Sequence, residues 1–253
     1  MWRLYHGSYA IVPFMRLHRF YLHQSIAHSV TDKEIKVENE DLVHQWRDVF
    51  RYTTGAQVIV FDGDGYDYLC MIAHIYSRTA ELAVVSKKKS VMPEVDMQRR
   101  IALAVSMIKK DNMELVIQKA TELGVSEIFP IVSERSEKKS LNMARAQKIA
   151  VEASEQSGRG DVPTIHEPVD LDEFFKLEDI DKFETKIACD PSGAKKLDKS
   201  MVQNSTLICI GPEGGYSDKE LELFNAQGFE IASLGSLVLR AETAAIAVLA
   251  MVN

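Results

Sequence analysis

One stretch late in the chain decides the fold: Leu207-Ile208-Cys209-Ile210-Gly211-Pro212-Glu213-Gly214-Gly215-Tyr216-Ser217. Its first four residues are apolar and predict a short buried strand, which the run Gly-Pro-Glu-Gly-Gly then ends. Ser217 follows as the N-cap of a helix, and Glu220, three residues later, completes a capping box. Open α/β sheets bind ligands where a strand runs into such a loop and helix, and glycines let the backbone approach the ligand closely. The stretch therefore predicts an α/β sheet with a ligand site at its carboxyl edge.

A second turn of similar kind follows at residues 234–240, Leu-Gly-Ser-Leu-Val-Leu-Arg, before an apolar terminal segment. We expect the two loops to close around one small molecule. Arg240 is a lone cation between an apolar strand and this segment, so we expect it to be partly buried and to need a partner for its five donors. Glu213 and Glu242 are the candidate partners, or a ligand takes that role. Each loop alone is more typical of an ordinary connection between a strand and a helix.

From Gln98 onwards strands alternate with helices, the pattern of a mostly parallel sheet. Asp111 is expected to cap a helix that ends at Gly124. No Gly-x-Gly-x-x-Gly follows the first strand and no Walker lysine is present, so dinucleotide and P-loop nucleotide binding are disfavoured. The other expected strands are 101–108, 128–132, 164–165, 185–189, 206–210 and 229–234, and the other expected helices are 144–157, 171–177, 218–226 and one from about 241.

The part of the chain before residue 90 is rich in short strands, expected at 34–37, 57–61, 68–72 and 80–85, with one short helix near 41–50. Asp62-Gly63-Asp64-Gly65 resembles part of a calcium loop, but it lacks the later glutamate and is interpreted as a hairpin turn. We therefore expect an extension (1–14), a small β-barrel-like domain (15–88) and an α/β domain (93–253). A polar linker, Lys87–Pro93, is expected between the two domains.

The composition is that of an ordinary soluble globular protein, with 46% apolar and 26% charged residues. No apolar run approaches the length of a membrane span, and residues 1–14 lack the core of a signal peptide. Cys70, Cys189 and Cys209 lie far apart in apolar runs without metal-site spacing, which indicates buried thiols in a reducing compartment. We expect a cytoplasmic protein with no metal and no membrane partner.

The net charge of −7 is unevenly distributed. Residues 1–90 carry 11 Lys and Arg against 10 Asp and Glu, whereas the residues after 160 carry 8 against 17. The overall charge therefore does not indicate a nucleic-acid partner. A nucleic acid would have to bind at local basic clusters. Such clusters are usually only solvated faces. The candidates are Arg16 with Arg19, 87–89, 99–100 and 109–110.

Together these motifs closely resemble the ribosomal small-subunit RNA uridine-N3 methyltransferases, a family of the trefoil-knotted SPOUT class. The resemblance rests on Gly211–Gly215 with Leu234-Gly235, Leu239-Arg240 and Glu242-Thr243-Ala244. It covers nearly the whole chain from Met15 onwards. The further matching stretches are 119–125, Glu134-Arg135-Ser136, 152–159, Arg16, Arg19-Phe20-Tyr21, Arg51 and 61–63.

The resemblance implies a PUA-like N-terminal domain for RNA and an α/β domain that binds S-adenosylmethionine in a deep trefoil knot. It also implies a homodimer with the site at the interface, and a uridine of 16S ribosomal RNA in the small ribosomal subunit as substrate. RNA contacts would come from Arg16, Arg19, Arg51, Gln156 and Arg159. Cofactor contacts would come from three loops, through Asp190, Pro191, Ile210, Gly211, Pro212, Gly214, Gly215, Leu234, Gly235 and Leu239.

For catalysis, our hypothesis is that Arg240 stabilises the anionic uracil oxygens or the RNA phosphate, while Glu213 or a water accepts the N3 proton. Glu213 could instead only orient Arg240. Two other functions stay open. One is a knotted methyltransferase of different specificity, such as 2′-O-ribose methylation of tRNA or ribosomal RNA. The other is a non-catalytic RNA-binding or assembly protein.

Overall fold

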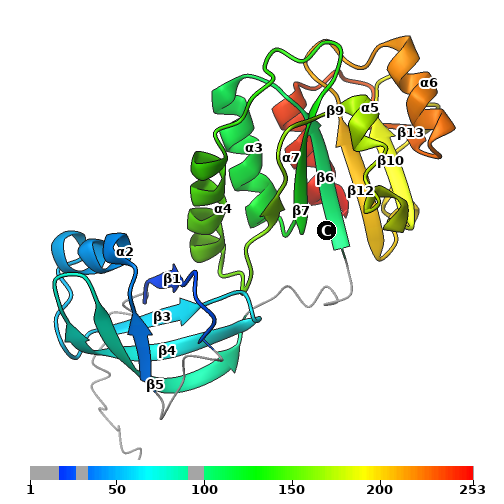
Figure 1. Ribbon diagram of the computed structural model, residues 1–253. Helices are drawn as coiled ribbons and strands as arrows, with labels where there is room; N and C mark the ends of the chain where they lie inside the picture. Colours follow the sequence, from blue (N-terminus) through cyan, green and yellow to red (C-terminus); the bar gives the residue numbers. More distant parts are fainter. Residues whose placement is uncertain (1–16, 27–33, 91–99, 253) are drawn as a thin grey trace, which may run out of the picture.

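The computed structural model describes residues 17–26, 34–90 and 100–252, which form two sheets one after the other along the chain (Figure 1). The predicted extension 1–14, Arg16 and the end of the predicted linker lie outside the described residues. The first sheet and its helices comprise β1 (Arg19–Tyr21), β2 (Glu34–Val37), α2 (Glu40–His44), the π-helical turn η1 (Gln45–Val49), β3 (Gln57–Phe61), β4 (Tyr66–Ile75) and β5 (Ala80–Lys89).

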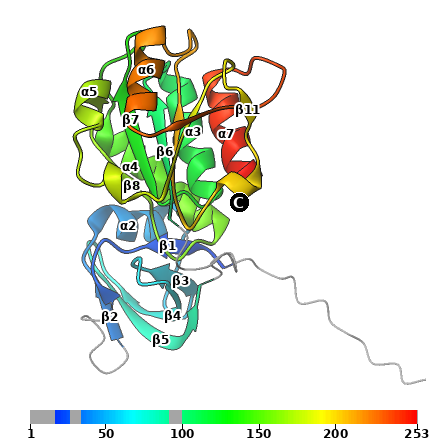
Figure 2. The same ribbon diagram turned by 90° about the vertical axis from the view of Figure 1, so that its right-hand side faces the viewer.

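The first sheet has five strands in the order β1-β3-β4-β5-β2 and is visibly curled (Figure 2). Its β1–β3 pair is parallel and the others are antiparallel. The predicted hairpin turn 62–65 is confirmed, with positive φ at Gly63 and Gly65. The predicted linker is wrong at its start, because β5 continues through Lys89. Lys87 lies over the rings of Tyr66 and Tyr68, and these contacts hold the polar run in the strand.

The second sheet has the order β11-β13-β10-β12-β6-β7-β8, with β9 also paired to β7. Every strand pair in it is parallel, so the predicted α/β fold with a mostly parallel sheet is confirmed. Its elements are β6 (Arg100–Ser106), α3 (Lys110–Glu122), β7 (Glu127–Val132), α4 (Met143–Ser157), β8 (Thr164–Ile165), β9 (Val169–Asp170), α5 (Leu171–Phe174), η2 (Ile180–Lys182), β10 (Thr185–Cys189), β11 (Lys195–Lys196), η3 (Lys199–Met201), β12 (Ser205–Ile210), α6 (Asp218–Ala226), β13 (Glu230–Ser233) and α7 (Ala241–Val252).

Helices cover both faces of this sheet (Figure 2), so the central strands β6 and β12 are buried at every position except the first. In β6, Leu103 faces one core, together with residues of α3, α4 and α7. Its neighbour Ala104 faces the other core, together with residues of α5 and α6. The alternation along one strand thus builds two cores on opposite faces of the sheet.

Two of the three predicted helix termini are confirmed, and the third is wrong. Ser217 and Glu220 form the predicted capping box, and Gly124 ends α3 with φ +83°. Asp111 does not cap α3, because the helix begins one residue earlier and Lys109 occupies the N-cap. The Asp111 carboxylate instead lies in the first turn, where its negative charge interacts favourably with the helix dipole.

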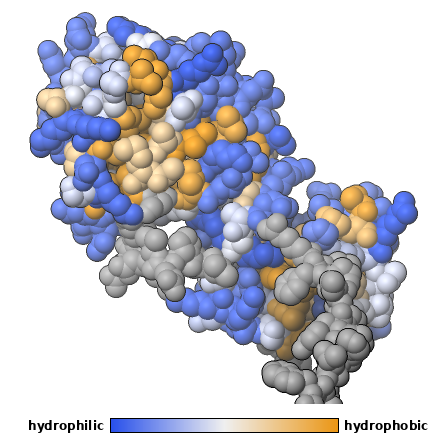
Figure 3. All heavy atoms as spheres, turned by 180° about the vertical axis from the view of Figure 1, so that it is seen from behind, coloured by the Kyte–Doolittle hydropathy of each residue, from blue (hydrophilic) through white to orange (hydrophobic). Residues whose placement is uncertain are grey.

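The terminal helix α7 has one buried and one open face. Val248 and Leu249 are fully buried in the core. The side chains at 243, 246, 247, 250 and 251 are half-buried or exposed, and all but Thr243 are apolar. Figure 3, which looks onto this side of the molecule, shows an apolar area on the α/β part. Described residues leave this face of α7 uncovered.

The two sheets meet at the C-terminal end of α4. Arg19 of β1 donates hydrogen bonds to the carbonyl oxygens of Ser154 at 3.2 Å and Arg159 at 2.8 Å. The backbone N–H of Tyr21 donates to Oε1 of Glu155 at 2.9 Å. Close packing adds to these bonds, because a Cβ on Gly160 would lie 2.6 Å from the side chain of Ser90. Within the described ranges, no helix is both long and apolar enough to span a membrane.

Candidate cofactor-binding site

A cavity of about 390 Å³ lies at the carboxyl edge of the second sheet. It forms where the loops after β10, β12 and β13 meet the first turn of α7. These three strands are neighbours in the sheet, in the order β13-β10-β12, so their carboxyl ends bring the loops together. All ten residues predicted to contact a cofactor line this cavity: Asp190, Pro191, Ile210, Gly211, Pro212, Gly214, Gly215, Leu234, Gly235 and Leu239.

Close packing explains why glycines occupy these loops. A Cβ on Gly211 would lie 3.2 Å from the ring of Tyr216. A Cβ on Gly193 would lie 2.6 Å from the backbone of Ala232 in β13. Gly215 has φ +70°, which side chains disfavour. The glycines therefore bring backbone of these loops close to the cavity.

The side chains of the wall are mostly apolar, with a few polar groups. Burial raises the pKa of the Cys189 thiol to about 12, so this group stays neutral at physiological pH. The Asp190 side chain lies at the edge of the cavity. Its Oδ1 accepts hydrogen bonds from the backbone N–H and the hydroxyl of Ser192, at 2.9 and 2.6 Å. An apolar wall with a few oriented polar groups is typical of small-molecule sites.

Both predicted catalytic residues, Glu213 and Arg240, are exposed at this edge of the sheet. Glu213 lines the cavity and is exposed. Arg240 is exposed too, which corrects the expectation of partial burial, and its neighbours Leu239 and Ala241 line the cavity. The expected strand 229–234 is confirmed as β13, and residues 234–240 form the expected turn between it and α7. In the described part of the chain, the Arg240 guanidinium pairs with neither Glu213 nor Glu242.

Two of the predicted RNA contacts are buried inside the protein. Arg159 is 7% exposed and donates to Asp161 and to the carbonyl oxygens of Thr121 and Val125. Arg19 is committed to the junction between the two sheets and lies over the ring of Phe61. Both guanidinium groups therefore bind protein acceptors and are not available to RNA in this structure.

The other predicted RNA contacts have different positions. Arg51 is exposed and has φ +55°, a conformation that only this non-glycine residue adopts among the described residues. Gln156 is exposed and lines a second cavity, between the first sheet and helices α3 and α4. Arg16 lies outside the described residues.

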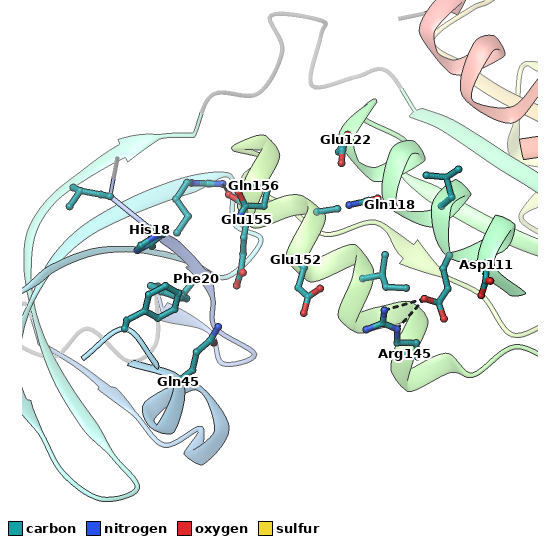
Figure 4. Close-up of a pocket in the computed structure, with 17 residues that line it drawn as sticks. His18, Phe20, Gln45, Asp111, Gln118, Glu122, Arg145, Glu152, Glu155 and Gln156 are labelled. Carbon is teal, nitrogen blue, oxygen red and sulfur yellow. Dashed lines mark hydrogen bonds and ion pairs between the residues drawn. The ribbon is translucent and has the colours of Figure 1, made fainter. Parts of the chain in front are cut away.

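The second cavity is larger, about 710 Å³, but its chemistry does not suit a phosphate (Figure 4). Arg145 projects toward it and pairs with Glu114 at 3.1 Å. Burial, with a smaller contribution from the neighbouring charge of Glu152, raises the pKa of the Glu155 carboxyl to about 7. Five carboxyl groups line the cavity, those of Asp111, Glu114, Glu122, Glu152 and Glu155.

Arg135 makes a contact at the cofactor-type cavity that the sequence does not predict. Arg135, from the loop after β7, donates from Nη1 to the carbonyl oxygen of Gly214 at 2.7 Å. The stretch Glu134-Arg135-Ser136 stands out in the sequence only through the family resemblance, and nothing local links it to residue 214. In the part of the chain that is described, no group of three or more His, Cys, Asp or Glu side chains is arranged to hold a metal ion.

The comparisons with known proteins agree with this geometry. The family model for the RNA methyltransferase domain matches residues 95–253. A ribosomal RNA small subunit methyltransferase E from Synechocystis is 31% identical over 219 residues, which span 83% of this chain and 70% of the relative. The chain belongs to the ribosomal RNA small subunit methyltransferase E family.

Further members of the methyltransferase E family align over almost the whole chain. The Rickettsia conorii member is 29% identical over 94% of this chain and 96% of its own length. The crystal structure of the Neisseria gonorrhoeae member, bound to S-adenosyl methionine, has a TM-score of 0.80 at 28% identity and covers 92% of this chain and 95% of that one. A putative methyltransferase from Legionella pneumophila in complex with the same cofactor has a TM-score of 0.81 at 29% identity, covering 94% and 97%.

Proposed function

We propose that this chain transfers a methyl group from S-adenosylmethionine to N3 of a uridine in 16S ribosomal RNA of the small ribosomal subunit. The observation that carries the proposal is the cavity at the carboxyl edge, which the loops of the family motif line. The relatives' names support the RNA substrate, and two structural neighbours hold S-adenosylmethionine.

The cavity fits this cofactor in size and chemistry. Its volume of about 390 Å³ lies within the range of small-molecule sites, roughly 300–1,000 Å³. Backbone groups of the loops at 190–192, 210–215 and 234–239 are available to hold the adenine and methionine parts. The carboxylates of Asp190 and Glu213 suit a ligand that carries positive charge. When bound, S-adenosylmethionine supplies an electrophilic methyl group on a sulfonium.

The chain's own residues must prepare the uridine. The N3 atom of uracil carries a proton at neutral pH, so catalysis requires removal of that proton and stabilisation of the charge that spreads over the uracil oxygens. Glu213, or a water beside it, accepts the proton from the cavity edge. Arg240 is free of internal partners among the described residues and exposed, so its guanidinium is available to the uracil oxygens or to the RNA phosphate. The loops place both groups beside the cavity, and such proximity to a bound uridine lowers the entropy cost of the transition state.

The domain organisation is part of the proposal. Residues 15–88 are a PUA-like RNA-binding domain and residues 93–253 the methyltransferase domain, with a trefoil knot at its C-terminus. The small side chains of Ala241 and Ala244 support the knot, because they let α7 lie directly against the cavity loops. The exposed side chains of Arg51 and Gln156 are the proposed RNA contacts among the described residues, and Arg16 is a further one.

The active form is proposed to be a homodimer. The open apolar face of α7 supports this, because a second copy would bury it (Figure 3). Leu237 and Val238, 79% and 81% exposed, extend the apolar surface beside the cavity. Sedimentation of the wild type and of Met251→Glu tests the dimer, since a charge on this face should produce monomers. A dimeric Met251→Glu variant would contradict the proposed interface.

The proposed location is the cytoplasm, where ribosomal RNA is available. The three free cysteines are all buried and suit a reducing compartment.

Incubation with methyl-labelled S-adenosylmethionine and small ribosomal subunits that lack the modification tests the function. We expect label in 16S ribosomal RNA for the wild type and strongly reduced label for Arg240→Ala. Absence of label from the RNA, while the protein still binds RNA, would favour a non-catalytic RNA-binding protein and contradict the proposal.

A further inference from the structure

The loop after β7 is fastened to the glycine-rich loop after β12, although β6 lies between these two strands. The backbone N–H of Glu134 donates to Oε1 of Glu220 at 2.8 Å. Nη1 of Arg135 donates to the carbonyl oxygen of Gly214 at 2.7 Å. Two hydrogen bonds therefore hold residues 134 and 135 against the loop that lines the cofactor-type cavity.

Glu220 serves both loops with one carboxylate. Its Oε2 accepts the backbone N–H of Ser217 at 2.8 Å, which is the capping box of α6. Its Oε1 is left for Glu134, 86 residues away in sequence. The side chain is only 6% exposed, so both bonds are shielded from water and are of the charge-assisted kind. Glu220 thus fixes the start of α6 and the position of the β7 loop together.

Gly214 lets Arg135 lie across the cavity loop. A Cβ on Gly214 would lie 3.2 Å from Cδ of Arg135, closer than an ordinary contact. The stem of Arg135 crosses at this point, and the side chain is exposed. Of its five N–H donors, only one on Nη1 has an acceptor among the described residues. The remaining donors of a held guanidinium therefore face outward beside the cavity.

We infer that Arg135 binds a phosphate of the substrate RNA next to the cavity and that Glu220 is the positioning residue that holds it there. The inference rests on the proposed function, since that function supplies the RNA. The guanidinium fork matches the geometry of a phosphate. The residues after 160 are strongly acidic, with 17 Asp and Glu against 8 Lys and Arg, so RNA approaching this edge of the sheet needs a cation held in a fixed position.

The first test uses Arg135→Gln in the full chain, with unmodified small ribosomal subunits as substrate. We expect the KM for subunits to rise about tenfold, as for the loss of one charged hydrogen-bonding contact. The KM for S-adenosylmethionine and the Tm should stay near the wild-type values, and Arg135→Lys should recover part of the loss. The matched control is Lys182→Gln, which removes one charge from an exposed residue just before β10, at the opposite edge of the sheet.

Salt dependence provides a second readout with an unmodified 16S ribosomal RNA transcript as the probe. Loss of one phosphate contact should reduce the slope of log Kd against log salt by about 0.7 to 1. Lys182→Gln should leave the slope unchanged. An equal loss of slope in both variants would mean that only overall charge matters, which overturns the inference.

A double-mutant cycle tests the role of Glu220. Glu220→Gln keeps the size of the side chain but leaves one acceptor oxygen for two N–H donors. We expect it to raise the KM for subunits in the wild-type background and to add little in the Arg135→Gln background, because both changes remove the same contact. Additive effects would overturn the positioning role.

Two results would contradict the phosphate contact, and they are distinguishable. A wild type that transfers methyl groups to the RNA, with an unchanged KM for subunits in Arg135→Gln, overturns this inference alone. A wild type that transfers no methyl group to RNA overturns the proposed function, and this inference with it.

Discussion

Arg19 and Asp67 form a buried ion pair, 2.6 Å long, at the junction between the curled sheet and the parallel sheet. Their side chains are 11% and 6% exposed. The same Asp67 oxygen accepts the hydroxyl of Ser90 at 2.8 Å, and the same arginine reaches the carbonyl oxygen of Arg159. The pair thus joins β1 and β4 to the residues that follow α4. Arg19, which the family resemblance suggests as an RNA contact, therefore has a structural role at this junction.

Removal of one partner of this pair should be costly, because the other is left buried and uncompensated. We expect Asp67→Asn to lower the stability by about 3 kcal/mol, or about 6–12 °C in Tm. Thermal unfolding measures this directly. The matched control is Lys36→Gln, which breaks the exposed pair with Glu38 and should leave the stability nearly unchanged. Equal small shifts for both variants would contradict the structural role of the junction.

The stability of the junction should depend on pH through Glu155. Burial raises the pKa of this carboxyl from 4.5 to about 7 in the folded chain. A raised carboxyl pKa means that the protonated form contributes stability, which is fully present below about pH 4.5 and is lost as the pH rises through about 7. The loss is at most about 3 kcal/mol.

Glu155→Gln tests this dependence, because the neutral amide still offers an oxygen to the Tyr21 N–H. We expect the variant to lose less stability than the wild type between pH 5 and pH 8. Unfolding curves at several pH values measure the difference. Parallel pH profiles of the two proteins would show that Glu155 does not titrate in this range.

The cofactor-type cavity should be sensitive to a single methyl group at Gly193. A Cβ there would lie 2.6 Å from the backbone of Ala232, and backbone atoms cannot move aside easily. We expect Gly193→Ala to destabilise the chain by about 1–3 kcal/mol and to weaken the binding of S-adenosylhomocysteine, measured by calorimetry. Gly228→Ala is the control, because its φ of +76° also makes an alanine there destabilising, whereas its Cβ would meet nothing within 4 Å and it lies away from the cavity. Ligand affinity should therefore stay unchanged in this variant. Unchanged ligand affinity in Gly193→Ala would contradict the assignment of the site.

The two proposed catalytic residues should affect turnover more than cofactor binding. Arg240→Ala is expected to lower kcat about 10²–10³-fold, because it removes the group that stabilises charge in the transition state. Glu213→Gln should also lower kcat, because an amide cannot accept the N3 proton. Steady-state kinetics with folded variants measures both. Full turnover in Arg240→Ala would exclude its proposed role.

Local signals in the sequence predicted the parts of the fold that depend on neighbouring residues. The capping box at Ser217 and Glu220, the helix end at Gly124 and the hairpin at 62–65 were all correct, because each depends on residues within a few positions. The parallel sheet was predictable from alternating strands and helices. The ten cavity residues were found because the family motif coincides with the carboxyl ends of three neighbouring strands.

The errors concern contacts that are distant in sequence. Arg19 and Arg159 look like RNA contacts in isolation, but Arg19 hydrogen-bonds to Arg159 across 140 residues. Arg240 was expected to be partly buried because its neighbours are apolar, yet Leu237 and Val238 are themselves exposed. Local hydropathy does not show whether the apolar residues of a loop face the core or the solvent.

The identity of the methylated nucleoside tests the proposed function most directly. Small ribosomal subunits that lack the modification are incubated with the wild type and methyl-labelled S-adenosylmethionine, and the 16S ribosomal RNA is digested to nucleosides. We expect the label in N3-methyluridine. Label in a ribose-methylated nucleoside would contradict the proposed specificity while keeping the cofactor and the fold.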